Sequence, residues 1–121
     1  TVIVAGLSTI ITGIAALIPA IAEKLVTLNE LHRNRWRPDI VNLLLETDTL
    51  RFGELKKQLG ITQKVLTENL KWLEENQIVI RTVYPEVPPR VEYSLTEIGK
   101  ELRDVHEAMR IWADYYVTHA K

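Results

Sequence analysis

The polar residues between Thr62 and Leu73 have the types and spacing that suit contact with a nucleic acid. Leu66, Leu70 and Leu73 recur at helical spacing, which predicts a helix with these leucines in the core. Amide side chains pair with base edges, and cationic side chains pair with phosphates. The outward positions of this helix carry both kinds of group: Gln63, Lys64, Thr67, Glu68 and Lys71. A charged outward row is usually only a solvated helix face, so the neighbouring elements are needed to decide between a solvated face and a nucleic-acid contact.

A short helix and a turn precede this polar row. Apolar residues mark one face of a predicted helix over residues 52–59, and Lys56 and Lys57 lie on the other. Gly60 suits the left-handed residue that ends a helix, and Thr62 suits the N-cap of the next one. Two helices joined by such a turn form a helix-turn-helix, whose second helix enters the major groove of DNA in many proteins.

Residues 78–95 are predicted to form two β-strands joined by a stiff loop that carries a cation. β-branched and aromatic residues precede the loop, and apolar and polar residues alternate after it. Three prolines stop the sheet and stiffen the tip, namely Pro85, Pro88 and Pro89. Arg90 follows them, and Thr96 suits the N-cap of a long closing helix. Taken alone, the hairpin favours plain structure; beside a helix-turn-helix it favours a DNA-binding wing.

The amino-terminal stretch from Thr1 to Ala22 contains no charged residue. Its larger apolar residues alternate at spacings of four and three, which is typical of a heptad seam, and small residues form a stripe beside them. A helix in a larger core, a dimerisation helix and a membrane span are the three interpretations. Pro19 interrupts the run and no Lys or Arg cluster precedes it, so dimerisation is favoured. We therefore expect a dimerisation segment over residues 1–32 and a winged helix-turn-helix domain over residues 33–121.

Three further segments complete the predicted domain. Arg33, Arg35 and Arg37 form a basic cluster around Trp36. A largely buried helix is predicted to start near Pro38, and a short strand at Leu50 and Arg51 follows it. The last helix has enough apolar positions for two contact faces, one on its own domain and one on a partner. The three tryptophans have two candidate roles, lining an effector pocket or packing in the core, and their helical spacings favour core packing: Trp36, Trp72 and Trp112.

The composition excludes several classes of protein. A chain of 121 residues with 46% hydrophobic content predicts one domain with a single core. The net charge of −1 means that DNA binding requires a local basic surface. Cysteine is absent, and the three histidines lie far apart in the sequence, so no thiol chemistry, metal site or other cofactor is expected. No nucleophile elbow or glycine-rich phosphate loop is present, so we do not expect an enzyme.

These motifs together resemble a known family. The run over residues 51–102 closely resembles the HxlR-type winged-helix transcriptional regulators, which are relatives of the MarR-like group. The block VYPEVPPRVEYSLT, residues 83–96, is the most specific signature, and Arg35 with Trp36 extends the resemblance to about Arg33. The resemblance implies a mainly α-helical fold with a small β-hairpin wing. It also implies a homodimer built from the N- and C-terminal helices, with a recognition helix and a wing on each subunit.

The resemblance also implies which residues contact DNA. Four would face the major groove or its phosphates from the recognition helix: Gln63, Lys64, Thr67 and Lys71. Arg90 would be the groove contact of the wing, and Arg35 and Arg51 would hold phosphates. Lys56 and Thr62 complete the predicted DNA-binding surface.

The predicted partners are double-stranded DNA, bound as an inverted-repeat operator, and a second copy of the chain. A small-molecule effector is left open, a membrane is disfavoured, and the expected location is the cytoplasm. Two features depart from the family. Members that sense electrophiles or oxidants use a cysteine near the amino end, and this chain has none. The apolar run before Ala22 is also longer than the usual leader.

One alternative function comes from a different class. Winged helices also serve as protein-interaction modules, and this one would be tethered to a membrane through residues 1–22. A docking module has no need to align cations with a recognition helix. The sequence contains such a basic row, which favours DNA binding: Lys56, Lys57, Lys64, Lys71 and Arg90.

Overall fold

A computed structural model describes residues 25–120. By compactness the chain divides into two units, Thr1–Asn34 and Arg35–Lys121. Of the first unit only residues 25–34 are described, and residues 25–33 are helical. The seam expected over residues 1–22 lies outside the described residues, so its role in dimerisation and the division at residues 32 and 33 stay predictions. Among residues 25–120, no helix is both long and apolar enough to cross a membrane.

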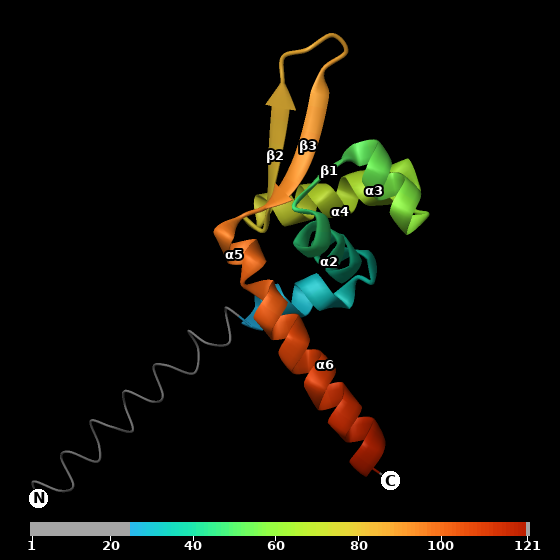
Figure 1. Cartoon of the computed structure of the whole chain (residues 1–121), viewed down its shortest axis with the longest axis vertical. Coiled ribbons are helices and arrows are strands. Elements are labelled where there is room, and N and C mark those ends of the chain that lie inside the picture. Colours follow the sequence, from blue (N-terminus) through green and yellow to red (C-terminus); the bar gives the residue numbers. More distant parts are fainter. Residues whose placement is uncertain (1–24, 121) are drawn as a thin grey trace, which may run out of the picture. The chain divides into compact units, whose positions relative to one another are not determined.

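The second unit is a winged helix-turn-helix, as the sequence predicted (Figure 1). Its elements in chain order are α2 (Trp36–Thr47), β1 (Thr49–Arg51), α3 (Phe52–Leu59), α4 (Gln63–Glu75), β2 (Val79–Tyr84), β3 (Arg90–Leu95), α5 (Glu97–Lys100) and α6 (Leu102–His119). The strands form one antiparallel sheet in the order β1-β3-β2. In Figure 1 the β2–β3 hairpin projects beyond the helices as the wing.

The core lies between α2, the helix-turn-helix and the root of the sheet. Because successive side chains of a strand point to opposite faces, only one face of the hairpin root joins this core. The buried residues of this core are Ile40, Val41, Leu44, Leu50, Leu55, Ile61, Leu66, Leu70, Leu73, Ile78, Val79, Tyr93 and Leu95. Burying each leucine or isoleucine side chain stabilises the fold by about 1.5–3 kcal/mol before the entropy of ordering is counted.

The turn between α3 and α4 is set by two capping residues. Gly60 adopts a left-handed conformation with φ of 63°, and its amide donates to the carbonyl oxygen of Lys56 at 3.0 Å. Glycine reaches this conformation without the steric penalty of a Cβ atom. The hydroxyl of Thr62 accepts a hydrogen bond from the amide of Val65 at 3.3 Å, which starts α4. The predicted left-handed glycine at the end of α3 and the predicted N-cap threonine of α4 are both confirmed.

Two predicted boundaries differ from the structure. α2 begins at Trp36, two residues before Pro38, which the first turn of a helix tolerates because its amides lack intrahelical acceptors. The single closing helix predicted after Thr96 is divided into α5 and α6 at Glu101. Thr96 caps α5 as predicted, since its hydroxyl accepts from the amide of Gly99 at 2.9 Å and donates to the carbonyl oxygen of Gln77 at 2.6 Å.

Close backbone packing joins α5 to the root of the wing. The amide of Thr96 donates to the carbonyl oxygen of Ile78 at 3.0 Å, and Gly99 packs against the same carbonyl group. A Cβ atom at Gly99 would collide with this oxygen, which belongs to the backbone and has no rotamer to change. Gly53 in α3, by contrast, has nothing within 4 Å of the place a Cβ would take.

We therefore expect Gly99→Ala to destabilise the domain by about 1–3 kcal/mol, because the backbone at Ile78 has to shift. Gly53→Ala serves as the matched control and should change the free energy of unfolding by no more than about 0.5 kcal/mol. Urea denaturation followed by circular dichroism measures both. Equal stabilities for the two variants would show that α5 is not held against the wing by this contact.

Candidate nucleic-acid interface

The outward face of α4 carries the predicted polar row. Gln63, Lys64, Thr67 and Lys71 are all exposed, while the three leucines of the helix are buried. The hydroxyl of Thr67 donates to the carbonyl oxygen of Gln63 at 2.7 Å, so it is engaged with its own helix. The Lys71 ammonium lies 3.9 Å from the carboxylate of Glu75, and such exposed pairs contribute little. Within the described residues the side chains of Gln63 and Lys64 make no hydrogen bond or ion pair, which leaves them available to a ligand.

A buried polar contact fixes α4 against α2. Asn69 is 2% exposed; its side-chain amide donates to the carbonyl oxygen of Val65 at 2.9 Å, and its side-chain oxygen accepts from Nε of Arg37 at 3.1 Å. The guanidinium of Arg37 also lies over the ring of Trp72, 4.1 Å from its centroid. In the sequence, Arg37 belongs to a basic cluster, and Asn69 gives no signal because periodicity does not mark a polar residue at a core position. Arg37 therefore serves the core, and α4 is held in its rotation by polar as well as apolar contacts.

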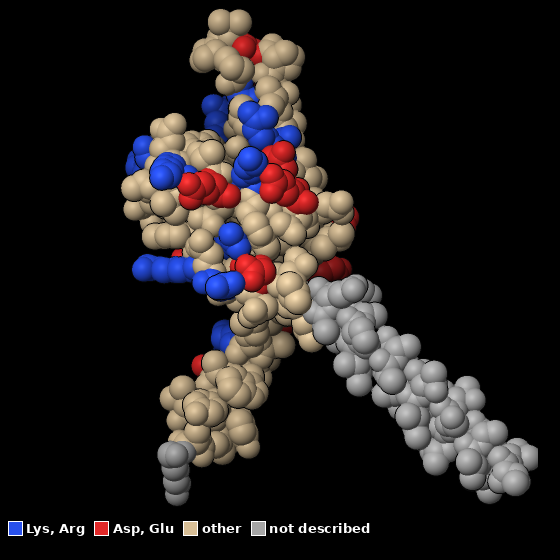
Figure 2. Space-filling view, turned by 180° about the vertical axis from the view of Figure 1, so that it is seen from behind, with Lys and Arg blue, Asp and Glu red and all other residues tan. Residues whose placement is uncertain are grey.

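The predicted wing cation, Arg90, is engaged inside the wing. Its guanidinium lies 3.1 Å from Glu86, 3.1 Å from Glu92 and 4.0 Å from the centroid of the Tyr84 ring. The side chain is only 29% exposed, and its Nε atom is buried without a hydrogen-bond partner. In a view from behind, the far end of the wing carries almost no blue surface (Figure 2). The structure thus places Arg90 in an ion-pair network inside the wing, and its contact with a DNA groove stays a prediction.

Arg81, a cation outside the predicted DNA-binding set, lies beside α4. Arg81 of β2 is exposed and lines a cavity of about 340 Å³ together with Thr67 and Lys71. Nothing in the sequence singles out Arg81, because it lies within a run of strand residues. The alternation of side chains along β2 nevertheless puts Arg81 on the same face as the buried Val79. Arg81 and the polar row of α4 therefore border one hollow.

The remaining predicted contacts are exposed but lie on three different elements. Arg35 precedes α2 and lies over the ring of its neighbour Trp36, 4.8 Å from the centroid. Arg51 ends β1, and its backbone amide donates to the carboxylate of Glu54 at 3.0 Å, which caps α3. Lys56 is exposed in the last turn of α3. The structure brings together the row on α4 but shows no hydrogen bond or ion pair, within the described residues, that joins these three cations to it.

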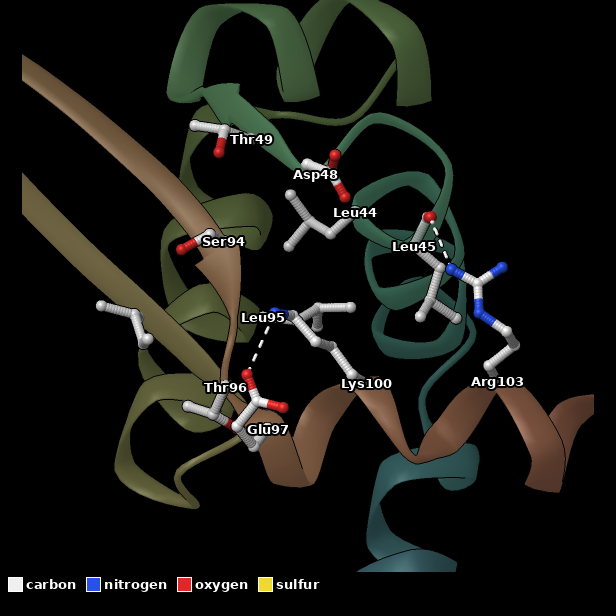
Figure 3. A pocket seen from close by; sticks show the side chains of 11 residues that line it. Leu44, Leu45, Asp48, Thr49, Ser94, Leu95, Thr96, Glu97, Lys100 and Arg103 are labelled. Carbon is white, nitrogen blue, oxygen red and sulfur yellow. Dashed lines mark hydrogen bonds and ion pairs between the residues drawn. The ribbon is translucent and has the colours of Figure 1, made fainter.

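A second hollow lies on the other face of the sheet. It has a volume of about 660 Å³ and is lined by Leu44, Leu45, Asp48, Thr49, Ile80, Ser94, Leu95, Thr96, Glu97, Lys100 and Arg103. Its two cations are already engaged, as Figure 3 shows: Lys100 pairs with Glu97 at 3.1 Å, and Arg103 donates to the carbonyl oxygen of Leu45 at 3.0 Å. No tryptophan lines it. Among the described residues that line it, this hollow therefore offers no unengaged cation and no tryptophan with which to bind a small-molecule effector.

The tryptophans divide into two groups. Trp36 and Trp72 are half-buried. Trp112 of α6 is 63% exposed, so the prediction that it packs in the core is wrong. α6 contributes no buried residue at all within the described chain, although its first turns contact α2. Its apolar side chains must therefore be covered by something outside this domain or remain in water.

Comparison with known proteins gives one family. The HxlR-like helix-turn-helix family matches residues 31–121. An HTH-type transcriptional regulator of Methanothermobacter thermautotrophicus is 41% identical over 95 residues, which cover 78% of this chain and 71% of that protein. The HTH-type transcriptional regulator YodB of Bacillus subtilis is 43% identical over 83 residues, covering 68% of this chain and 73% of that protein. These relatives are transcriptional regulators and not enzymes.

Solved structures agree with this assignment. The reduced form of YodB from B. subtilis has a TM-score of 0.71 and 40% identity, and the match covers 77% of this chain and 91% of that chain. A MarR-family transcriptional regulator from Enterococcus faecalis has a TM-score of 0.71 and 34% identity, covering 80% of this chain and 87% of that chain.

Proposed function

Since the chain belongs to the HxlR-like helix-turn-helix family of transcriptional regulators, we propose that it binds a specific DNA operator with α4 in the major groove. The observation that carries this proposal is the division of α4 into a buried leucine face and an exposed row of amide and cationic side chains. Such a row suits the major groove, where an amide distinguishes adenine and cations bind the flanking phosphates.

We assign a role to each predicted contact residue from its position and from the interactions that it already makes within the domain. Gln63 is exposed in the first turn of α4, the part of a recognition helix that contacts base edges in helix-turn-helix proteins, so we assign it to base reading. Lys64 and Lys71 are assigned to phosphates, with Lys56, Arg51 and Arg35 as outer phosphate contacts. Thr62 and Thr67 use their hydroxyl groups within α4 and contribute by position.

We further propose that the protein acts as a homodimer through α6. The exposed apolar residues of this helix are Met109, Ile111, Trp112, Tyr115, Tyr116 and Val117. The rings of Trp112 and Tyr116 stack on each other at 5.2 Å between centroids, which makes a continuous apolar surface. Exposed apolar patches of this kind mark association sites, and a two-fold dimer buries the same patch of both subunits. A two-fold dimer would also present two recognition helices to an inverted repeat.

The polar side of α6 suits the solvent side of such a dimer. Arg110 pairs with Glu107 and with Asp114. The hydrogen bond between Arg110 and Glu107 lowers the pKa of the glutamate and raises the pKa of the arginine. These groups lie fully at the surface, so the pairs keep α6 hydrated on this side and add little stability.

The alternative of a membrane-tethered docking module receives no support from the described residues. The stretch that would provide the tether, residues 1–22, lies outside them. We place the protein in the cytoplasm because its proposed ligand is chromosomal DNA.

The base-reading role of Gln63 predicts a loss of specificity when the amide is removed. Gln63→Ala should cost about 1–3 kcal/mol on the operator, because one bidentate pair with adenine is lost, and should leave binding to random duplex nearly unchanged. Gln58→Ala is the matched control, since Gln58 is an exposed glutamine of α3 that borders α2. Titration of labelled operator and random duplexes measures both; equal losses on the two DNAs would show that Gln63 reads no base.

The role of α6 predicts that a charge on its apolar side dissociates the dimer. Trp112 is exposed in the single chain, so Trp112→Glu should leave the fold intact while it places a carboxylate in the interface. Sedimentation should then give a monomer, and operator affinity should fall because the second half-site no longer gains from effective concentration. Thr118→Glu adds the same charge elsewhere on α6, four residues after Asp114, and should remain dimeric. A dimer that survives Trp112→Glu would remove this side of α6 from the interface.

A further inference from the structure

The two arginines of the wing lie on opposite faces of the hairpin. In the β2–β3 register Arg81 pairs with Tyr93, and Tyr84 pairs with Arg90. Residues an odd number of positions apart on one strand point to opposite faces, so Arg81 and Tyr84 face opposite ways. Tyr93 is 8% exposed and faces the helices, which places Arg81 on the side of α4 and Arg90 on the side away from it.

The charge of Arg90 is already neutralised where it lies. Glu86 and Glu92 each lie 3.1 Å from its guanidinium, so the local sum of these three charges is −1 (one positive and two negative). The loop between the strands, residues 85–89, has Glu86 as its sole charged residue. A phosphate brought to the end of the wing would therefore meet negative charge before it met a free cation.

Arg81, in contrast, is paired with no carboxylate in the described residues, although Glu74 lines the same cavity. Its guanidinium makes no ion pair or hydrogen bond there, and it borders the cavity of about 340 Å³ between α4 and β2. Lys71 borders the same cavity from α4, with only the long pair to Glu75 at 3.9 Å. Leu70 and Tyr93 give the cavity an apolar floor. Two cations from different elements thus converge on one hollow beside the recognition helix.

We propose that this hollow is a binding site for a backbone phosphate of duplex DNA, with Arg81 as its principal cation and Lys71 as the second. A guanidinium presents paired donors that match two phosphate oxygens, which an ammonium group does not. Arg90 is then a positioning residue that holds the shape of the wing through Glu86, Glu92 and Tyr84. The site deepens the proposed DNA-binding function and rests on it.

One acidic residue at the same hollow sharpens the inference. Glu74 of α4 also lines the cavity, so its carboxylate opposes a phosphate bound there. Removing this charge without changing the size of the side chain should strengthen DNA binding if a phosphate occupies the hollow. Glu74→Gln and Arg81→Ala therefore have opposite expected effects, and general damage to the fold would not produce that pair of results.

The test is a titration of full-length variants with operator and random duplex DNA over a series of salt concentrations. Arg81→Ala should weaken binding to both DNAs alike and reduce the log–log salt slope by about one unit, because one phosphate contact is lost. Arg90→Ala should weaken binding with the slope unchanged, and Glu74→Gln should tighten binding at low salt. Lys100→Ala is the control, since Lys100 borders the cavity on the opposite face of the sheet and should leave both affinity and slope unchanged.

The results separate this site from the proposed function. A wild-type slope in Arg81→Ala together with a reduced slope in Arg90→Ala would overturn the site and leave DNA binding at the tip of the wing standing. Wild-type affinity in Glu74→Gln would likewise remove the phosphate from the hollow. If the wild-type chain binds neither operator nor random duplex, the proposed function itself fails.

Discussion

The burial of one face of α4 is the constraint on which the rest of the domain depends. Leu66, Leu70 and Leu73 are 0%, 2% and 0% exposed, and together they fix the rotation of the helix about its axis. Turning α4 about its axis by about 100°, the angle of one residue, would expose these leucines to water. Each exposed leucine would destabilise the fold by roughly 1.5–3 kcal/mol. Because that rotation is fixed, Gln63 and Lys64 face outward without any contact of their own to hold them there. The core thus determines which chemistry the surface presents.

Two sets of backbone contacts fix the wing relative to α4. The amide of Ile78 donates to the carbonyl oxygen of Leu73 at 2.9 Å, which ties the start of the hairpin to the end of α4. The carbonyl of Ile78 then receives the amide of Thr96 and packs against Gly99, which ties the end of the hairpin and α5 to the same point. The helix α4, the wing and the closing helices therefore meet at one residue, Ile78. These contacts join the strand that carries Arg81 to the helix that carries Lys71, and both residues line one cavity.

Sequence reasoning predicted the elements well, because each depends on local rules. The turn at Gly60, the cap at Thr62 and the proline-tipped hairpin follow from backbone chemistry that the residues carry with them. The environment of Arg90 could not be predicted in the same way, since it depends on which side chains meet across the hairpin and in which rotamers. For the same reason the hydrogen bond between Asn69 and Arg37 could not be predicted from the periodicity, since the two residues are 32 positions apart and lie on different helices.

Selection of duplexes from a random pool by the full-length protein, followed by footprinting, tests most directly whether α4 is a recognition helix in a two-fold dimer. The expected result is an enriched inverted repeat with protected half-sites whose centres lie about 34 Å, one helical turn, or a multiple of this apart. A pool without any enriched sequence, or protection of a single asymmetric site, would contradict it.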